Sequence, residues 1–176
     1  LEMVANFFGK IDCLVANAGI GGGASKPADV SLEEWNKVIG VNQTGIFLVN
    51  KYVIPYMIKN GGGSIVNTSS MYGIVGAPNS FAYTASKGAI NQMTRTLSLA
   101  YAENNIRVNA IAPGYVDTAI LSSVPDEYKK MMAKEMPIGR LGTDDEIASL
   151  VKFLLSEEAS FITGAIISID GGYTAK

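Results

Sequence analysis

Residues 64–114 read SIVNTSSMYGIVGAPNSFAYTASKGAINQMTRTLSLAYAENNIRVNAIAPG. An apolar strand at residues 64–68 is followed by a long helical pattern at residues 82–102. A second apolar strand at residues 106–112 ends at Pro113-Gly114. A strand, a helix and a second strand in this order form the βαβ unit of a parallel sheet. The stretch therefore predicts an α/β fold.

The same alternation continues before this stretch. A strand at residues 11–16 leads into a glycine-rich loop at residues 19–28, and a helix then begins at Ser31. Ser31 and Glu34 have the spacing of a capping box. The apolar stripe of this helix continues through Tyr52, and Pro55 with the glycines at 61–63 is expected to close it.

After the stretch, helices are predicted at residues 126–134 and 144–155, the second with Thr143 as N-cap, and a last strand at residues 165–169. The 176 residues have the size of one domain, with no repeat or linker. We therefore predict a single domain over residues 1–176, built on a doubly wound parallel sheet. Because residues 1–8 look like the end of a helix already under way, we expect the N-terminus to be incomplete.

Composition excludes several classes of function. The chain has no histidine, which excludes Ser-His-Asp catalysis and metal sites that need histidine, and we predict no metal site. The net charge of −2, without blocks of like charge, indicates neither nucleic acid nor membrane as a partner. The single cysteine, Cys13, fits a reducing compartment such as the cytoplasm, and its apolar surroundings predict a buried strand residue.

Tyr83 and Lys87 are four residues apart in the helix at 82–102, so their side chains share one face. The pKa of a free tyrosine is about 10, and a neighbouring ammonium would lower it toward the range of a general acid or base. The alternative is that Tyr83 packs and Lys87 is a solvated helix charge. Taken alone, the pair favours that alternative.

Ser70 follows the strand at residues 64–68, at the end of the sheet where ligands bind in parallel α/β folds. Its hydroxyl could hold a substrate oxygen, whereas its neighbour Ser69 is better explained by a turn. Asn42 lies seven residues after Trp35 on an apolar helix face, so its amide needs partners. Those partners are either a main-chain group or a proton relay that includes Lys87.

Together these residues resemble the classical short-chain dehydrogenase/reductase family over essentially the whole chain. The resemblance rests on the catalytic tetrad, in which the serine precedes the tyrosine by thirteen residues, and on an Asn-Ala-Gly and a Pro-Gly-x-Val-x-Thr motif. It extends to Arg107-Val108-Asn109 and Asp170-Gly171-Gly172. The tetrad matches Asn42, Ser70, Tyr83 and Lys87, and the two motifs match Asn17, Ala18 and Gly19 and Pro113, Gly114, Val116 and Thr118.

The resemblance implies a Rossmann-like fold, NAD or NADP as cofactor, and hydride transfer to or from an alcohol or ketone. It implies that Tyr83 is the general acid/base, that Lys87 lowers its pKa and binds the nicotinamide ribose, and that Ser70 orients the substrate oxygen. Asn42 would anchor a proton relay, and the two motifs would hold the nicotinamide end of the cofactor. The family also commonly forms homodimers or homotetramers, and Ala85, Gly88 and Ala89 would allow close helix approach.

The family's Thr-Gly-x-x-x-Gly-x-Gly segment is not found in this sequence. Gly19-x-Gly21-x-x-Ala24 imitates a dinucleotide motif, but no helix follows it directly, and we interpret it as a flexible loop near the substrate. The residue that would separate NAD from NADP use is therefore not identified. Residues 119–136 carry apolar side chains among lysines, which predicts either a lid over the substrate or an ordinary surface helix.

Two other functions stay open at this point. The first is 3-oxoacyl-[acyl-carrier-protein] reductase of the same family, which residues 137–142 resemble. The second is a non-catalytic binding or scaffold protein on the same fold, which would have no need of Tyr83 and Lys87 together. An enoyl reductase would space these two residues more widely.

Overall fold

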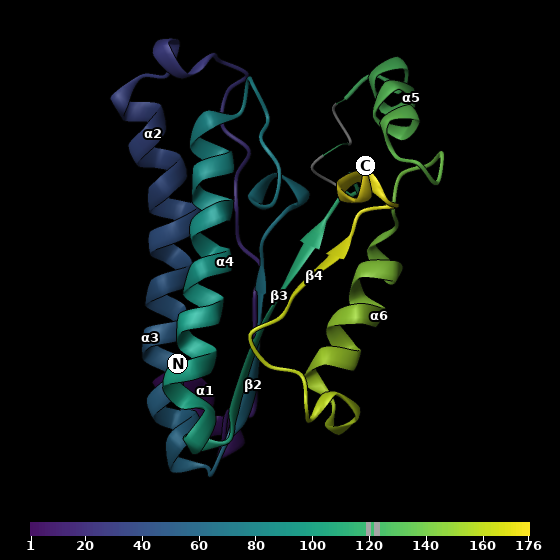
Figure 1. The fold of residues 1–176 in the computed structure, drawn as a ribbon. Coiled ribbons are helices and arrows are strands. Elements are labelled where there is room, and N and C mark those ends of the chain that lie inside the picture. The colour runs from purple at the N-terminus through teal and green to yellow at the C-terminus, as the bar shows by residue number, and fades with distance from the viewer. Residues whose placement is uncertain (119–120, 122–123) are drawn as a thin grey trace.

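The structure is a computed structural model that describes residues 1–118, 121 and 124–176. In this part of the chain, four parallel strands form one sheet in the order β1-β2-β3-β4 (Figure 1). The α/β class and the parallel sheet predicted from the sequence are confirmed. The strands are β1 (Cys13–Ala16), β2 (Gly63–Thr68), β3 (Ile106–Pro113) and β4 (Ile166–Ile169).

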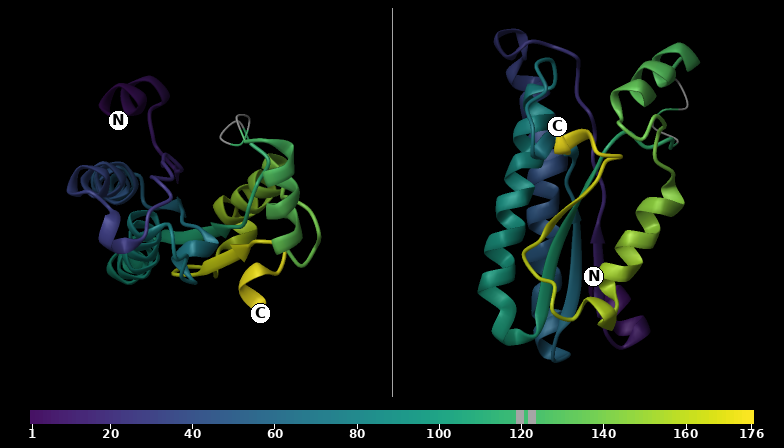
Figure 2. Two further views of the ribbon diagram at one scale, coloured as in Figure 1. Left: turned by 90° about the horizontal axis from the view of Figure 1, so that it is seen from above. Right: turned by 45° about the vertical axis from the view of Figure 1, so that its right-hand side comes forward.

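Helices cover both faces of the sheet, as a doubly wound fold requires. Helices α3 and α4 lie on one face and α6 on the other, and the view from above shows these two layers (Figure 2). None of the helices in the described residues is long and apolar enough to cross a membrane. The helices are α1 (Glu2–Phe8), α2 (Leu32–Ile39), α3 (Gly45–Lys59), α4 (Phe81–Tyr101), α5 (Asp126–Glu135) and α6 (Asp144–Leu155).

The side chains of β2 show how the two layers are held. Ile65 is fully buried in a cluster with Met57 of α3, and Asn67 on the same face bonds to side chains of α3 and α4. Val66 points the opposite way, into a cluster with Leu154 of α6. Successive side chains of a β-strand point to opposite faces of the sheet, which explains this alternation. Burying each such aliphatic side chain contributes about 1.5–3 kcal/mol, so both faces bind helices tightly.

Helix α3 differs from the sequence-based prediction at two points. A π-helical turn at Gly40–Thr44 separates α2 from α3, and Pro55 lies inside α3, which continues to Lys59. The prediction that Pro55 takes part in closing the helix is therefore wrong. An internal proline costs about 3 kcal/mol, but α3 buries Val53, Ile54 and Met57 around it, and this packing offsets that cost.

Two local predictions near β1 need correction. Ser31 does cap α2, since its Oγ accepts the N–H of Glu34 at 3.1 Å. However, the Glu34 carboxylate does not complete a capping box, because it accepts the N–H of Gly23 at 2.6 Å instead. Cys13 is exposed and not buried, because β1 is an edge strand of the sheet in the described residues.

Candidate active site

A cavity of about 620 Å³ lies at the carboxyl ends of β1, β2 and β3. These ends meet at one edge of the sheet because the strands are parallel, and this is where ligands bind in such folds. Helix α4 contributes Tyr83 and Lys87 from the side. The predicted site residues that line the cavity are Asn17, Gly19, Ser70, Tyr83, Lys87, Pro113, Gly114, Val116 and Thr118.

Two predicted residues do not line this cavity. Ala18 is exposed, and Asn42 is fully buried within the π-helical turn. The Asn42 amide donates to the Ile20 carbonyl at 2.9 Å, and its Oδ1 accepts the Ile20 N–H at 2.8 Å. Asn42 thus satisfies main-chain groups of the loop after β1, which is one of the two roles expected of it.

Asn42 also lies close to Lys87. A Cβ atom added to Gly19 would be 3.4 Å from Asn42 Oδ1 and 3.5 Å from Lys87 Nζ, so both side chains converge on this glycine. Both distances are ordinary van der Waals contacts, so the loop at Gly19 lies directly against both side chains.

The Lys87 ammonium is buried and approaches two groups. Its Nζ donates to the Thr68 carbonyl at 2.7 Å and lies 5.5 Å from the centre of the Tyr83 ring. Only 3% of the Lys87 residue surface is exposed. Because burial penalises the charged form, the pKa of Lys87 falls to about 8.

The Tyr83 hydroxyl experiences two opposing effects. Burial raises its pKa above the usual value, while a hydrogen bond with Ser70 acts in the lowering direction and is the smaller effect. The net shift of the Tyr83 pKa is upward, and the lowering effect predicted for Lys87 stays a prediction. The reason is that the loss of water around the phenolate outweighs the other contributions.

The two serines after β2 have different partners. Ser70 is buried, and its Oγ accepts the N–H of Tyr72 at 3.2 Å while the residue lines the cavity. Ser69 Oγ donates to the Lys87 carbonyl at 3.1 Å. The latter bond ties the segment after β2 to α4, the helix that carries Tyr83.

A second cavity of about 270 Å³ adjoins the first. Ser70 and Tyr83 line both cavities, whereas Lys87 lines the larger one. The glycine-rich loop predicted to lie near the substrate forms one wall of the smaller cavity. The residues lining it are Gly21, Gly22, Gly23, Ala24, Ser70, Met71, Tyr72, Ser80, Tyr83, Gly114 and Tyr115.

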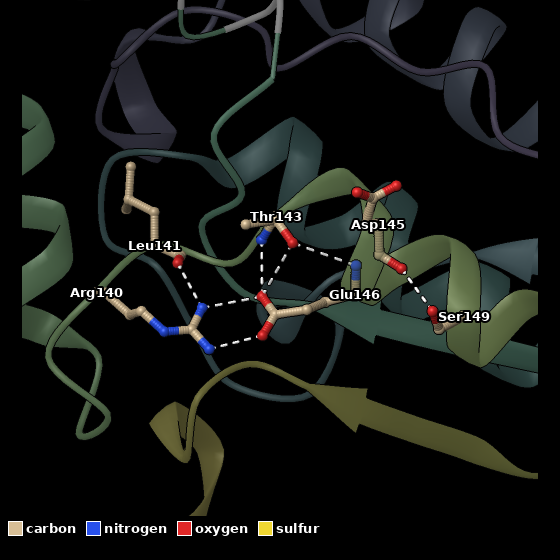
Figure 3. A network of polar contacts seen from close by, with 6 residues as sticks. All are labelled: Arg140, Leu141, Thr143, Asp145, Glu146 and Ser149. Carbon is tan, nitrogen blue, oxygen red and sulfur yellow. Dashed lines mark hydrogen bonds and ion pairs between the residues drawn. The ribbon is translucent and has the colours of Figure 1, made fainter.

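The start of α6 forms part of the wall of the larger cavity, which the sequence analysis did not predict. Thr143 is the N-cap of α6 as predicted, and with Glu146 it forms a complete capping box; the Glu146 carboxylate also binds Arg140 at 2.6 and 2.9 Å (Figure 3). These bonds lower the pKa of Glu146 to about 2. The sequence did carry one signal for this helix face, because the apolar residues Ile147 and Val151 are four positions apart. The lining residues from α6 are Asp144, Ile147, Ala148 and Val151.

Other motif residues serve the backbone outside the cavities. Asn109 bonds to the Ile162 carbonyl and the Ala165 N–H, and Asp170 accepts the N–H groups of Gly172 and Thr174.

No group of acidic or cysteine side chains suited to a metal ion occurs among the described residues. The predicted lid at residues 119–136 falls partly outside the described residues, at 119–120 and 122–123, and α5 forms most of the rest.

Comparison with known proteins identifies the family. A model of short-chain dehydrogenases/reductases, described as enoyl-(acyl carrier protein) reductase, matches residues 1–174. The chain is 42% identical over 175 residues to a cis-4-hydroxycyclohexanecarboxylate dehydrogenase of Sinomonas cyclohexanicum, covering 99% of the chain and 70% of that protein. The chain belongs to the short-chain dehydrogenase/reductase family. It is also 44% identical over 172 residues to a 3-oxoacyl-[acyl-carrier-protein] reductase of Thermotoga maritima, covering 98% of the chain and 70% of that protein.

Solved structures of the same family agree with this fold. ElxO with NADP bound superposes with a TM-score of 0.95 at 34% identity, covering 99% of this chain and 72% of that one. The structure of gox2181 superposes with a TM-score of 0.93 at 36% identity, covering 99% and 70%. As a member of the short-chain dehydrogenase/reductase family, the protein is an oxidoreductase that uses NAD or NADP.

Proposed function

We propose that the protein interconverts an alcohol and a ketone, with Tyr83 as the general acid/base. The observation that carries this proposal is that Ser70 and Tyr83 line both cavities, while Lys87 lines the larger one. The larger cavity would hold the nicotinamide end of the cofactor and the smaller one the substrate. When bound, the dinucleotide supplies or accepts the hydride.

The larger cavity fits a nicotinamide and its ribose. Its volume of about 620 Å³ lies within the usual range of ligand pockets. Lys87 has three N–H donors and gives one to the Thr68 carbonyl, so the others can bond ribose hydroxyls. The residues that would hold this end of the cofactor are Asn17, Ala18, Gly19, Tyr83, Lys87, Pro113, Gly114, Val116 and Thr118.

Each catalytic candidate has a separate task in this proposal. Tyr83 gives its hydroxyl proton to the carbonyl oxygen in reduction and takes it back in oxidation. Ser70 donates a hydrogen bond to the same oxygen and keeps it within reach of Tyr83. The positive charge of Lys87 favours the tyrosinate that reduction leaves behind. Asn42 holds the loop after β1 beside Lys87 and anchors the relay that returns the proton.

The test is an absorbance assay of the nicotinamide with NAD and NADP and a panel of alcohols and ketones. Tyr83→Phe should lower kcat at least about a hundredfold, the usual scale of general acid–base catalysis, and leave cofactor affinity largely unchanged. Tyr101→Phe makes the same substitution at the far end of α4 and serves as the matched control.

A Tyr83→Phe variant with the kcat of the wild type would contradict the assignment. Turnover of no alcohol or ketone with either cofactor would instead favour the non-catalytic scaffold.

A second candidate is reduction of a 3-oxoacyl thioester. It is favoured by the 44% identity to the Thermotoga maritima reductase. The same four residues would carry that reaction, so the substrate alone separates the two functions. Adding an acetoacetyl thioester to the panel distinguishes them, since a kcat/KM far above that of every simple ketone would establish the reductase.

We also infer a homodimer or homotetramer, a cytoplasmic location and a single domain over residues 1–176. The apolar side chains exposed on α3 and α4 support association, and the single cysteine fits a reducing compartment. Nucleic acid and membrane are not expected as partners, because the charge is small and evenly spread.

A further inference from the structure

We propose that Tyr72 and Tyr115 select the substrate, and that it is a compact, uncharged alcohol or ketone whose second polar group binds this pair. The inference rests on the proposed function, because it takes Ser70 and Tyr83 as the reacting end of the smaller cavity. It adds what the tyrosine pair that lines the same cavity would recognise.

The hydroxyl groups of Tyr72 and Tyr115 lie next to each other, and both residues line the smaller cavity. Their hydroxyl oxygens are 2.6 Å apart. Tyr72 lies two residues after Ser70, and Tyr115 directly follows Gly114, so both come from segments that already build the site. The two rings pack edge to face with centres 6.2 Å apart, and the Tyr173 ring packs against Tyr72 at 6.1 Å. This packing holds the hydroxyls in place.

None of the described residues that line this cavity could balance the charge of a substrate. The described residues that line it are glycines, an alanine, serines, a methionine and tyrosines, none of which is a cation. Burial raises the pKa of both Tyr72 and Tyr115, so their hydroxyls stay protonated at neutral pH, and the negative charge of Glu135 acts in the same direction. A carboxylate placed here would lose water without gaining a partner of opposite charge.

The size of the cavity fits a single ring. A cavity of about 150 Å³ is enough to hold benzene, so about 270 Å³ accommodates a six-membered ring with one or two small substituents. One substituent would react at Ser70 and Tyr83, and a second hydroxyl or carbonyl would bond to the tyrosine pair. Pockets of this kind are mostly apolar and use a few polar groups to orient the ligand.

The preference for the second polar group should be moderate. Without such a group, Tyr72 and Tyr115 keep the hydrogen bond between their hydroxyls, and the complex loses only the hydrogen bond from the pair to the substrate. A substrate that lacks the group is therefore disfavoured by about tenfold, the size of one net hydrogen bond, and is not rejected outright.

The experiment compares kcat/KM for cyclohexane-1,4-diol, cyclohexanol and cis-4-hydroxycyclohexanecarboxylate. In the wild type, the diol should exceed cyclohexanol by about tenfold, and the carboxylate should be the poorest of the three. In the double variant Tyr72→Phe/Tyr115→Phe, the diol-to-cyclohexanol ratio should fall to about one. Tyr101→Phe should keep the ratio of the wild type, and an unfolding midpoint for each variant verifies that it folds.

The outcomes separate this inference from the proposed function. If the wild type turns over these alcohols but its diol-to-cyclohexanol ratio survives the double substitution, the role of the tyrosine pair is refuted while the role of Tyr83 stands. A carboxylate preferred over cyclohexanol likewise overturns the uncharged cavity alone. Turnover that persists in Tyr83→Phe, or that is absent with every substrate, overturns the proposed function and this inference with it.

Discussion

The Nζ of Lys87 lies 5.5 Å from the centre of the Tyr83 ring in the interior of the site. Burial moves the two pKa values apart, that of the tyrosine upward from 10.0 and that of the lysine from 10.5 down to about 8. Each shift favours the neutral form of its group. Charging both groups, as a tyrosinate beside an ammonium, therefore depends on the attraction between the two charges to offset the cost of burying them.

Replacing Lys87 by alanine should impair both chemistry and cofactor binding. The variant loses the charge beside Tyr83 and the donors proposed for the ribose, so kcat and cofactor affinity should each fall about tenfold to a hundredfold. Steady-state kinetics and calorimetry with NAD and NADP measure the two effects. Lys152→Ala, which removes an exposed lysine of α6, is the control. An unchanged cofactor affinity in Lys87→Ala would refute the ribose contact.

Replacing Lys87 by methionine should stabilise the cofactor-free protein at neutral pH. The folded-state pKa of about 8 lies below the ordinary value of 10.5, so the unfolded chain binds more protons between these values. The cost of the buried charge is thus fully present below about pH 8 and disappears as the pH rises toward 10.5. At about 1.4 kcal/mol per unit, Lys87→Met should gain up to about 3 kcal/mol at pH 7 and much less at pH 10.

Urea unfolding of the wild type and of Lys87→Met at both pH values measures this difference, and titrations shared by the two proteins cancel. A gain of the same size at pH 7 and pH 10 would mean that the variant acts through packing and not through the charge.

Glu34 should matter for substrate binding although it lies outside the cavities. Its carboxylate holds the N–H of Gly23 at 2.6 Å and thereby keeps the glycine-rich wall of the smaller cavity against α2. Glu34→Ala should raise the KM for the alcohol several-fold and leave the cofactor affinity unchanged. Glu33→Ala removes a neighbouring charge from the same helical turn, so it controls for the interaction with the helix dipole. Equal KM values for the two variants would disprove the anchoring role.

The protein should associate in solution through α3 and α4. Phe47 is 49% exposed on α3 and Leu99 is 82% exposed on α4, which is unfavourable for large apolar side chains unless another surface covers them. Light scattering should give the mass of a dimer or tetramer, and Phe47→Asp should lower it. Phe161→Asp changes a fully exposed phenylalanine elsewhere and should not. A stable wild-type monomer would contradict the prediction.

Much of the fold and part of the site could be predicted from local patterns. The alternation of strand and helix periods predicted the parallel sheet, because side-chain periodicity is a property of neighbours in the chain. The four-residue spacing of Tyr83 and Lys87 placed them on one helix face, and the position of Ser70 after β2 placed it at the ligand-binding edge of the sheet. The structure brings these three residues to one cavity.

What the sequence could not determine depends on groups that are distant along the chain. The direction of the Tyr83 pKa shift follows from burial, and Pro55 is tolerated because of what α3 packs against. Tyr72 and Tyr115 are 43 residues apart, and no local sequence pattern predicts that their hydroxyls form a hydrogen bond. Periodicity and spacing act over a few residues, whereas desolvation and side-chain contacts are set by whichever segments the fold brings together. The sequence by itself therefore determined the parallel sheet and the helix face that Tyr83 and Lys87 share, and only the tertiary structure decided the direction of their pKa shifts and the walls of the site.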